Sequence, residues 1–272
     1  RTQTTYTTLQ TALDEAQPDD VILIAAGTVT EKLSVTKSIT LKGSGKDSTV
    51  LTSSDAASGV IVLNASGITV HICDLTIENA ICIDLADQMV TNLYLKDSVL
   101  KSNTGAHQKS RGIRALHNSK VEGNVLELDN TQILNTSISD YETQATIADT
   151  RGISLYDYAG NVTLKNGSSI KGFGYCINVS GTTSESGVAD TKGLVVPVED
   201  SELAGWTGFN VWGSEATYNI TRSRVLGINT SSGSSNSFAA IVFNDDLYDQ
   251  FENIHAVNNT LNITDSTITN YQ

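Results

Sequence analysis

Proline and cysteine are both scarce in this chain, and each scarcity excludes something. Only two prolines occur, Pro18 and Pro197, so there is no proline-rich linker and no strong sign of a domain boundary. The three cysteines, Cys73, Cys82 and Cys176, leave at least one thiol unpaired. No CxxC motif is present, so neither a zinc site nor a redox pair is expected. All three cysteines lie in apolar runs, which predicts buried thiols.

Positive charge is scarce as well. Lysine and arginine number 17 against 30 aspartates and glutamates, for a formal net charge of −13. Such a chain lacks the cations that nucleic-acid phosphates need, and an anionic membrane surface would repel it. An acidic polysaccharide is disfavoured for the same reason, although a local basic patch could still bind one. Because no apolar run approaches the roughly 20 residues of a membrane-spanning helix, membrane insertion is not expected.

The abundant residues are small and polar. Thr, Ser, Asn and Asp are frequent, 21 residues are glycine, and hydrophobic residues make up 39% of the chain. Asn, Asp and Gly tolerate the left-handed conformation that tight corners demand. The composition therefore favours many short strands joined by turns.

One segment type recurs along the chain. It consists of an apolar residue, two intervening residues, often an Asx–Ser/Thr pair, and then another apolar residue, as in HICDLTI (71–77) and YLKDSVL (94–100). The steps between successive copies range from 22 residues (Val198 to Ile220) to 43 residues (Ile220 to Ile263). The first apolar residues of the seven copies are Ile72, Leu95, Leu128, Leu164, Val198, Ile220 and Ile263.

A second segment type lies between these anchors and is short and rich in strand-forming residues. Its copies are NAICIDL (79–85), RGIRALH (111–117), RGISLYD (151–157), GYCINVS (174–180), TGFNVWG (207–213) and AAIVFND (239–245). A strand of about five residues buries too little apolar surface to be stable alone. Stacked on equivalent strands about 4.8 Å away, it forms a continuous apolar ladder.

The two interleaved repeats thus predict an all-β solenoid of parallel strands. The shortest steps correspond to one turn of the coil, and the longer steps would carry loops that project from one corner. The alternative is a β-sandwich, which also contains many short strands.

The start of the chain predicts a cap. In TTLQTALDEAQ (7–17), Leu9, Ala12, Leu13 and Ala16 form one apolar face of a short helix. A solenoid needs such a cover for its first layer. We expect one domain, with residues 1–20 as the N-terminal cap and residues 21–272 as coils.

The order of elements over residues 8–45 resembles the opening of pectin-lyase-like right-handed parallel β-helix proteins. In that family a capping helix precedes a set of short strands with characteristic turns. The matching residues are Asp19–Asp20–Val21, Ala26–Gly27–Thr28–Val29, Glu31–Lys32–Leu33 and Ile39–Thr40–Leu41–Lys42–Gly43. The resemblance implies a single right-handed parallel β-helix. It implies little about activity, because this fold hosts lyases, hydrolases, phage tailspikes and surface adhesins.

Side chains of the second segment type should alternate between the interior and the outer face. The expected inward pairs are Ile81/Ile83, Ile113/Ala115, Ile153/Leu155, Ile177/Val179, Phe209/Val211 and Ile241/Phe243. The expected outward pairs are Cys82/Asp84, Arg114/Leu116, Ser154/Tyr156, Asn178/Ser180, Asn210/Trp212 and Val242/Asn244.

Stacking would join part of this outward set into one long strip of aromatic and amide groups. Tyr and Trp rings can pack against the apolar faces of sugars, while amides and Arg supply directional hydrogen bonds. The strip therefore predicts glycan binding, against the alternative that it is an ordinary exposed sheet face. Its residues are Arg114, Tyr156, Asn178, Asn210, Trp212 and Asn244.

A polysaccharide lyase is the main rival. Arg111, Arg114 and Arg151 are the basic residues suited to a base on this face. The carboxylates that could ligate Ca²⁺ are Asp84, Asp157, Asp245 and Asp246. These residues do not reproduce the pectate lyase arrangement of Asp ligands with a paired catalytic Arg.

A glycoside hydrolase is less supported still. It would need two carboxylates about 5 to 9.5 Å apart, for which Asp157 and Asp246 are candidates. The polygalacturonase signatures NTD, DD followed by GHG, and RIK are missing. His71, His107, His117 and His255 show no metal-binding spacing.

The sequence therefore favours a non-catalytic adhesin module on a bacterial cell surface that binds a glycan or a host surface protein. It resembles the β-helix modules of large bacterial surface proteins. The chain stops at ITNYQ in mid-repeat, which predicts that it is part of a longer surface protein. No catalytic residue and no cofactor are expected, and Ca²⁺ is the only ion for which ligands can be named. An enzyme on acidic, pectin-like polysaccharide and a purely structural stalk are the alternatives.

Overall fold

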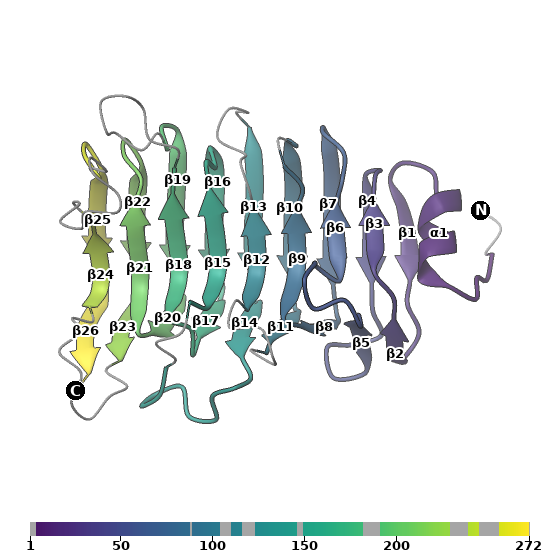
Figure 1. Cartoon of the computed structure of the whole chain (residues 1–272), viewed down its shortest axis with the longest axis horizontal. Coiled ribbons are helices and arrows are strands. Elements are labelled where there is room, and N and C mark those ends of the chain that lie inside the picture. The colour runs from purple at the N-terminus through teal and green to yellow at the C-terminus, as the bar shows by residue number, and fades with distance from the viewer. Residues whose placement is uncertain are drawn as a thin grey trace.

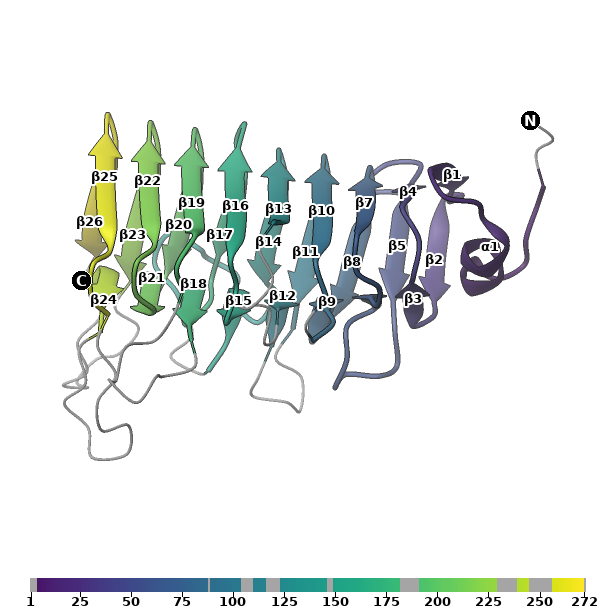
Figure 2. The same ribbon diagram turned by 90° about the horizontal axis from the view of Figure 1, so that it is seen from above.

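Three long sheets of parallel strands make up the computed structural model of the protein. It describes residues 4–87, 89–103, 110–115, 123–145, 149–181, 191–228, 239–244 and 256–271. The strands of each sheet lie side by side along the long axis, from helix α1 (Leu9–Glu15) at one end to β26 near the other (Figures 1 and 2). Every strand pairing is parallel, and the chain visits the three sheets in turn, which is the architecture of a parallel β-helix.

The three sheets are here named A, B and C in the order in which the chain meets them. Sheet A contains β1 (Asp20–Leu23), β4 (Ile39–Lys42), β7 (Ile68–Cys73), β10 (Thr91–Lys96), β13 (Asn124–Asp129), β16 (Gly160–Lys165), β19 (Leu194–Glu199), β22 (Thr217–Thr221) and β25 (Thr260–Thr264). Sheet B contains β2 (Gly27–Thr30), β5 (Thr49–Thr52), β8 (Thr76–Asn79), β11 (Val99–Ser102), β14 (Gln132–Asn135), β17 (Ser169–Lys171), β20 (Glu202–Gly205), β23 (Arg224–Ile228) and β26 (Thr267–Tyr271). Sheet C contains β3 (Leu33–Val35), β6 (Ile61–Leu63), β9 (Ile81–Leu85), β12 (Arg111–Ala115), β15 (Arg151–Tyr156), β18 (Tyr175–Ser180), β21 (Thr207–Trp212) and β24 (Ala239–Phe243).

The register confirms the repeat read from the sequence. In sheet A, Ile72 pairs with Leu95, Leu95 with Leu128, and the series continues unbroken to Ile263. In sheet C, Ile83, Ile113, Ile153, Ile177, Phe209 and Ile241 pair in the same way. Their side chains point inward and, apart from the partly exposed last coil, are buried in one continuous core. The all-β solenoid is confirmed, and the β-sandwich is excluded because no antiparallel pairing joins the described strands.

The corner between sheets A and B is short because one residue there adopts a left-handed backbone. The recurrent Asx position of the first repeat supplies it. The residues with positive φ at this corner are Asp74, Asp97, Asn130, Asn166, Asp200, Arg222 and Asp265. A polar side chain at such a position tolerates the conformation better than a bulky apolar one.

At three of these corners a serine hydroxyl links neighbouring coils, namely Ser168, Ser223 and Ser266. Ser223 Oγ accepts the backbone N–H of Ser201 at 3.1 Å, and Ser266 Oγ accepts that of Ser223 at 3.0 Å. The hydroxyls thus satisfy backbone donors that the tight turn would otherwise leave unpaired. The recurrent Asx–Ser/Thr pair therefore has a structural role.

The longer connections do not all project from one corner, as the spacing of the anchors had suggested. They occur at both ends of sheet C: residues 136–150 join sheet B to sheet C, and residues 181–193 join sheet C to sheet A. The connection that contains Ala145 folds over the outer face of sheet B, where Ala145 packs with Ala204, Leu226 and Ile228. The sequence could not separate the two corners because the segments between anchors have no common pattern.

The predicted cap is present. Leu9, Ala12 and Leu13 of α1 are buried. The N–H groups of Leu9 and Gln10 donate to the Glu31 carboxylate, which suits the positive end of the helix. Lys37 Nζ donates to carbonyls at the other end of the helix, including that of Asp14 at 2.6 Å.

Gln10 closes the exposed edge of β3. Its side-chain amide accepts the backbone N–H of Ser34 at 2.9 Å and donates to the Ser34 carbonyl at 3.3 Å. An open strand edge is otherwise prone to pairing with other chains. We expect Gln10→Ala to lower the free energy of unfolding by about 1 to 2 kcal/mol, measured by urea denaturation. The matched Gln17→Ala, at an exposed position, should leave it within about 0.5 kcal/mol of the parent. Equal effects of the two changes would contradict this role.

Candidate functional site

The outer face of sheet C carries the predicted glycan-binding residues, and the structure divides them into three groups. The first is Arg114 on β12. Its Nε and Nη2 donate to the two carboxylate oxygens of Asp84 at 2.7 and 2.9 Å. Asp84 is 8% exposed and also accepts the backbone N–H of Gly59 at 2.8 Å. Arg114 is therefore engaged in an ion pair that ties β12 to β9 and to the connection before β6.

The second group is a ladder of amides. Asn244 Nδ2 donates to Asn210 Oδ1 at 2.8 Å, and Asn210 Nδ2 donates to Asn178 Oδ1 at 2.7 Å. Asn178 is 2% exposed and Asn210 7%. The expectation of an open amide strip is thus corrected at these two positions. Stacking at the strand spacing lets the amides satisfy one another, which the alternation of side chains alone does not reveal.

The third group is a row of three side chains near the ends of their strands. Tyr156 on β15 pairs in register with Ser180 on β18, and Ser180 pairs with Trp212 on β21. All three are partly exposed. At the usual strand spacing the two aromatic residues are about 9.6 Å apart, with the small Ser180 between them. This row, here called the Tyr156–Trp212 row, is the part of the predicted strip that keeps aromatic groups at the surface.

The other outward positions are mostly covered. Cys82 and Ser154 are buried, and Leu116 lies outside the described residues. All three cysteines are free thiols, with Cys82 and Cys176 buried as predicted and Cys73 partly exposed. Burial raises the pKa of Cys82 to about 12, so this thiol stays protonated at neutral pH.

The two other arginines considered for a lyase share a carboxylate. Arg111 Nη2 and Arg151 Nε donate to the two oxygens of Asp149 at 3.1 and 3.0 Å. Burial, with the positive charge of Arg151, lowers the pKa of Arg111 to about 10, which leaves it charged at neutral pH. Burial alone would raise the pKa of Asp149, but Arg151 and Arg111 outweigh it and lower that pKa. The two arginines and Asp149 form a charged network that joins β12 and β15.

The carboxylates considered for metal binding do not come together in the described part of the chain. Asp84 is held by Arg114, and Asp157 is buried at the end of β15. Asp245 and Asp246 lie outside the described residues, as do His107, His117 and His255. Among the residues that the structure describes, no three His, Cys, Asp or Glu side chains are grouped to hold a metal ion.

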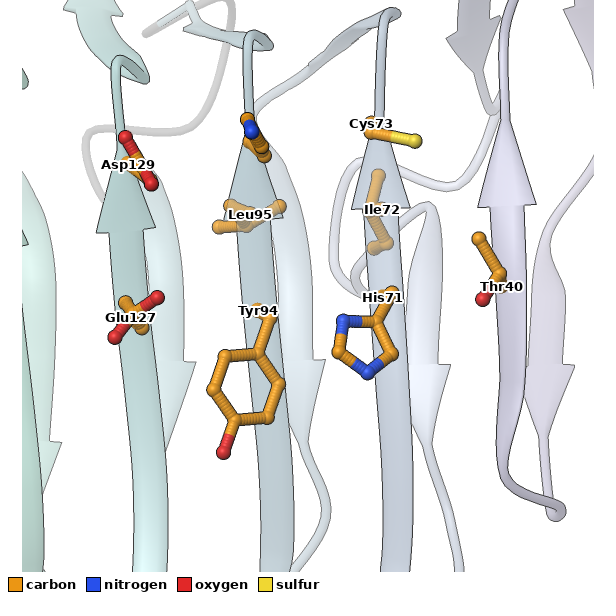
Figure 3. A pocket seen from close by; sticks show the side chains of 9 residues that line it. Thr40, His71, Ile72, Cys73, Tyr94, Leu95, Glu127 and Asp129 are labelled. Atoms are coloured by element: carbon orange, nitrogen blue, oxygen red, sulfur yellow. The ribbon is translucent and has the colours of Figure 1, made fainter. Parts of the chain in front are cut away.

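The outer face of sheet A holds a hollow that the sequence reading missed. It has a volume of about 460 Å³ and is lined by Thr40, His71, Ile72, Cys73, Tyr94, Leu95, Lys96, Glu127 and Asp129. The rings of His71 and Tyr94 are nearly parallel, with centroids 4.8 Å apart and an angle of 14° between the planes. Figure 3 shows the two rings on neighbouring strands with their faces turned toward the viewer, and Glu127 on the next strand beyond Tyr94. This ring pair is here called the His71–Tyr94 platform.

A signal for this platform was present in the sequence. HICDLTI and YLKDSVL are adjacent copies of the first repeat, and both open on the aromatic residue just before the apolar anchor. Aligning the anchors Ile72 and Leu95 puts His71 opposite Tyr94, which is their register in sheet A. The binding strip predicted from the sequence came from the second repeat, which forms sheet C, and did not include the outward positions of the first repeat.

Comparison of the chain with protein-family models, with curated proteins and with solved structures found no match. In the described part of the chain, no helix has the length and apolarity to cross a membrane.

Proposed function

We propose that this protein is a non-catalytic module that binds glycan at a bacterial cell surface through the outer face of sheet C. The observation that carries the proposal is the Tyr156–Trp212 row, two partly exposed aromatic side chains in one register row with Ser180 between them. Aromatic side chains present a wide apolar face with a polar edge, which suits the two kinds of surface on a sugar. We also infer a right-handed winding, as in pectin-lyase-like proteins, since parallel strands joined by crossovers take that hand.

The surroundings of the row support binding. The long connections flank sheet C at both of its ends, and binding residues often lie where loops border a rigid scaffold. The buried amide ladder next to the row links β18, β21 and Asn244 by hydrogen bonds. A face fixed in this way loses little freedom when a ligand binds, which favours affinity.

The arginines of the same face are engaged in ion pairs, which favours a binding function over a catalytic one. Arg114 donates from Nε and Nη2 to Asp84, and Arg111 and Arg151 each donate to Asp149. An arginine that acts as a base must lose a proton, and a bound carboxylate opposes that loss. These ion pairs serve to hold coils together.

The test is glycan binding by Trp212→Ala. We expect the wild-type protein to bind members of an array of neutral oligosaccharides and release no products from them. Loss of a central aromatic contact should weaken binding by about thirtyfold, and Tyr156→Ala should have a similar effect.

Tyr6→Ala is the matched control, because it removes a partly exposed aromatic side chain beside the capping helix instead of one on sheet C. It should leave binding of these neutral sugars unchanged. Unaltered binding by Trp212→Ala and Tyr156→Ala would refute the assignment to sheet C. Release of oligosaccharides from pectin-like polymers by the wild-type protein would refute a non-catalytic role.

A further inference from the structure

The His71–Tyr94 platform lies in a stretch of sheet A whose outer face carries no carboxylate. The outward side chains of β4, β7 and β10 follow from the register. They are Thr40, Lys42, Thr69, His71, Cys73, Asn92, Tyr94 and Lys96. This stretch therefore presents two ammonium groups in a protein whose net charge is −13. The outward side chains of these three strands thus carry a charge opposite in sign to that of the whole molecule.

Of the two lysines, Lys96 has fewer interactions with other side chains of the protein. Its side chain is exposed and has no hydrogen bond or ion pair within the described part of the chain. Lys42 Nζ lies 3.8 Å from Asp74 Oδ2, and both side chains are well exposed. An exposed pair at that distance contributes little energy, so Lys42 also remains available to an anion.

The carboxylates at the far side of the hollow share the ammonium group of Lys165. Lys165 Nζ lies 2.8 Å from Glu127 Oε1 and 3.8 Å from Asp129 Oδ2. Asp129 also accepts Asn166 Nδ2 at 2.8 Å. The hydrogen bond that Lys165 donates to Glu127 raises the pKa of Lys165, which keeps the ammonium charged. Both acids of β13 thus contact Lys165, and neither forms an ion pair with Lys96 in the described part of the chain.

The centre of the hollow is neutral. Cys73 lies in register between Lys42 and Lys96. Burial and the neighbouring Asp74 raise the pKa of its thiol, so it carries no negative charge at neutral pH. A ligand over this position would meet ring faces on one side and, on the other, Lys42 and Lys96, whose strands are about 10 Å apart.

We propose that the His71–Tyr94 platform is a second binding site, for an oligosaccharide that carries a negatively charged sugar. One pyranose face packs on the rings of His71 and Tyr94, and the anionic group binds Lys96. The exposed ring faces explain why a sugar would bind here, and the unpaired Lys96 ammonium explains why that sugar would be negatively charged. A fully neutral sugar would leave Lys96 without a partner. The site is on a different sheet from the Tyr156–Trp212 row and does not depend on it.

Titration with two matched sugars, 3′-sialyllactose and lactose, tests the site directly. Isothermal titration calorimetry should give about fivefold tighter binding of the charged sugar to the wild-type protein at low salt, an advantage that salt should screen. Lys96→Gln should remove that advantage while lactose binding stays the same. Tyr94→Ala should weaken the binding of both sugars to this site by about tenfold.

Two controls separate this site from other effects. Lys101→Gln removes the same charge from β11, in the same coil but on sheet B, and should leave the preference for 3′-sialyllactose intact. Trp212→Ala should also leave the preference for 3′-sialyllactose intact. Equal affinity for the two sugars, or an unchanged preference in Lys96→Gln, would overturn the proposal and leave the sheet C function untouched. Loss of all sugar binding in Trp212→Ala alone would also overturn it.

Discussion

Arg114→Ala is expected to lower the free energy of unfolding by about 3 kcal/mol. The arginine makes two hydrogen bonds to Asp84, whose side chain is only 11% exposed. Without Arg114, that carboxylate keeps a single donor among the described residues, the backbone N–H of Gly59. A buried charge that loses its partner costs far more than the pair contributed. Urea denaturation at neutral pH measures the difference.

Two comparisons show whether the uncompensated charge is the cause. The double variant Asp84→Asn with Arg114→Ala removes the charge together with its partner and should recover part of the lost stability. Arg224→Ala breaks ion pairs to Glu142 and Glu202 in a more exposed place and should cost less than about 1 kcal/mol. A loss for Arg114→Ala no larger than that for Arg224→Ala would show that Asp84 finds water or another donor.

The apolar anchors of the fold were predictable because they obey a local rule that repeats. Ile72 and Leu95 each stand two residues before an aspartate, and a parallel solenoid must align equivalent positions. The aligned anchors are register partners in the structure. The corner residues were predictable for the same reason, since Asp74 and Asp97 occupy the corner between sheets A and B, where a left-handed residue recurs from coil to coil.

The site was less predictable because its contacts join coils whose separation in sequence varies. Arg114 and Asp84 are 30 residues apart, and Asn178 and Asn210 are 32 apart. Alternation along a strand says which way a side chain points. It does not say whether the neighbour above will bond to it, so outward amides were read as free when they satisfy one another. A second rule, that like side chains in one register row pair across coils, would have identified the ladder.

Phe209→Ala is expected to cost about 3 to 5 kcal/mol, the usual range for removing a buried aromatic side chain. Phe209 is 1% exposed, and its ring meets Tyr218 edge to face at a centroid distance of 5.7 Å. Tyr218 meets Phe243 of the next coil in the same geometry at 5.6 Å. One substitution therefore opens a cavity between sheets A and C and removes a ring from a cluster that spans two coils.

The destabilisation should also be local, because each coil of a solenoid contacts only its neighbours. Hydrogen exchange in Phe209→Ala should accelerate in β18, β21 and β22, while β4 and β7 keep the protection of the wild-type protein. Phe209→Leu retains most of the buried volume and should cost less than about 1.5 kcal/mol. Uniform loss of protection along the whole chain would mean that the coils unfold as one cooperative unit. The Tyr156–Trp212 row would then depend on the same global stability, and Trp212→Ala could be interpreted as a binding defect only where its unfolding curve matches that of the wild-type protein.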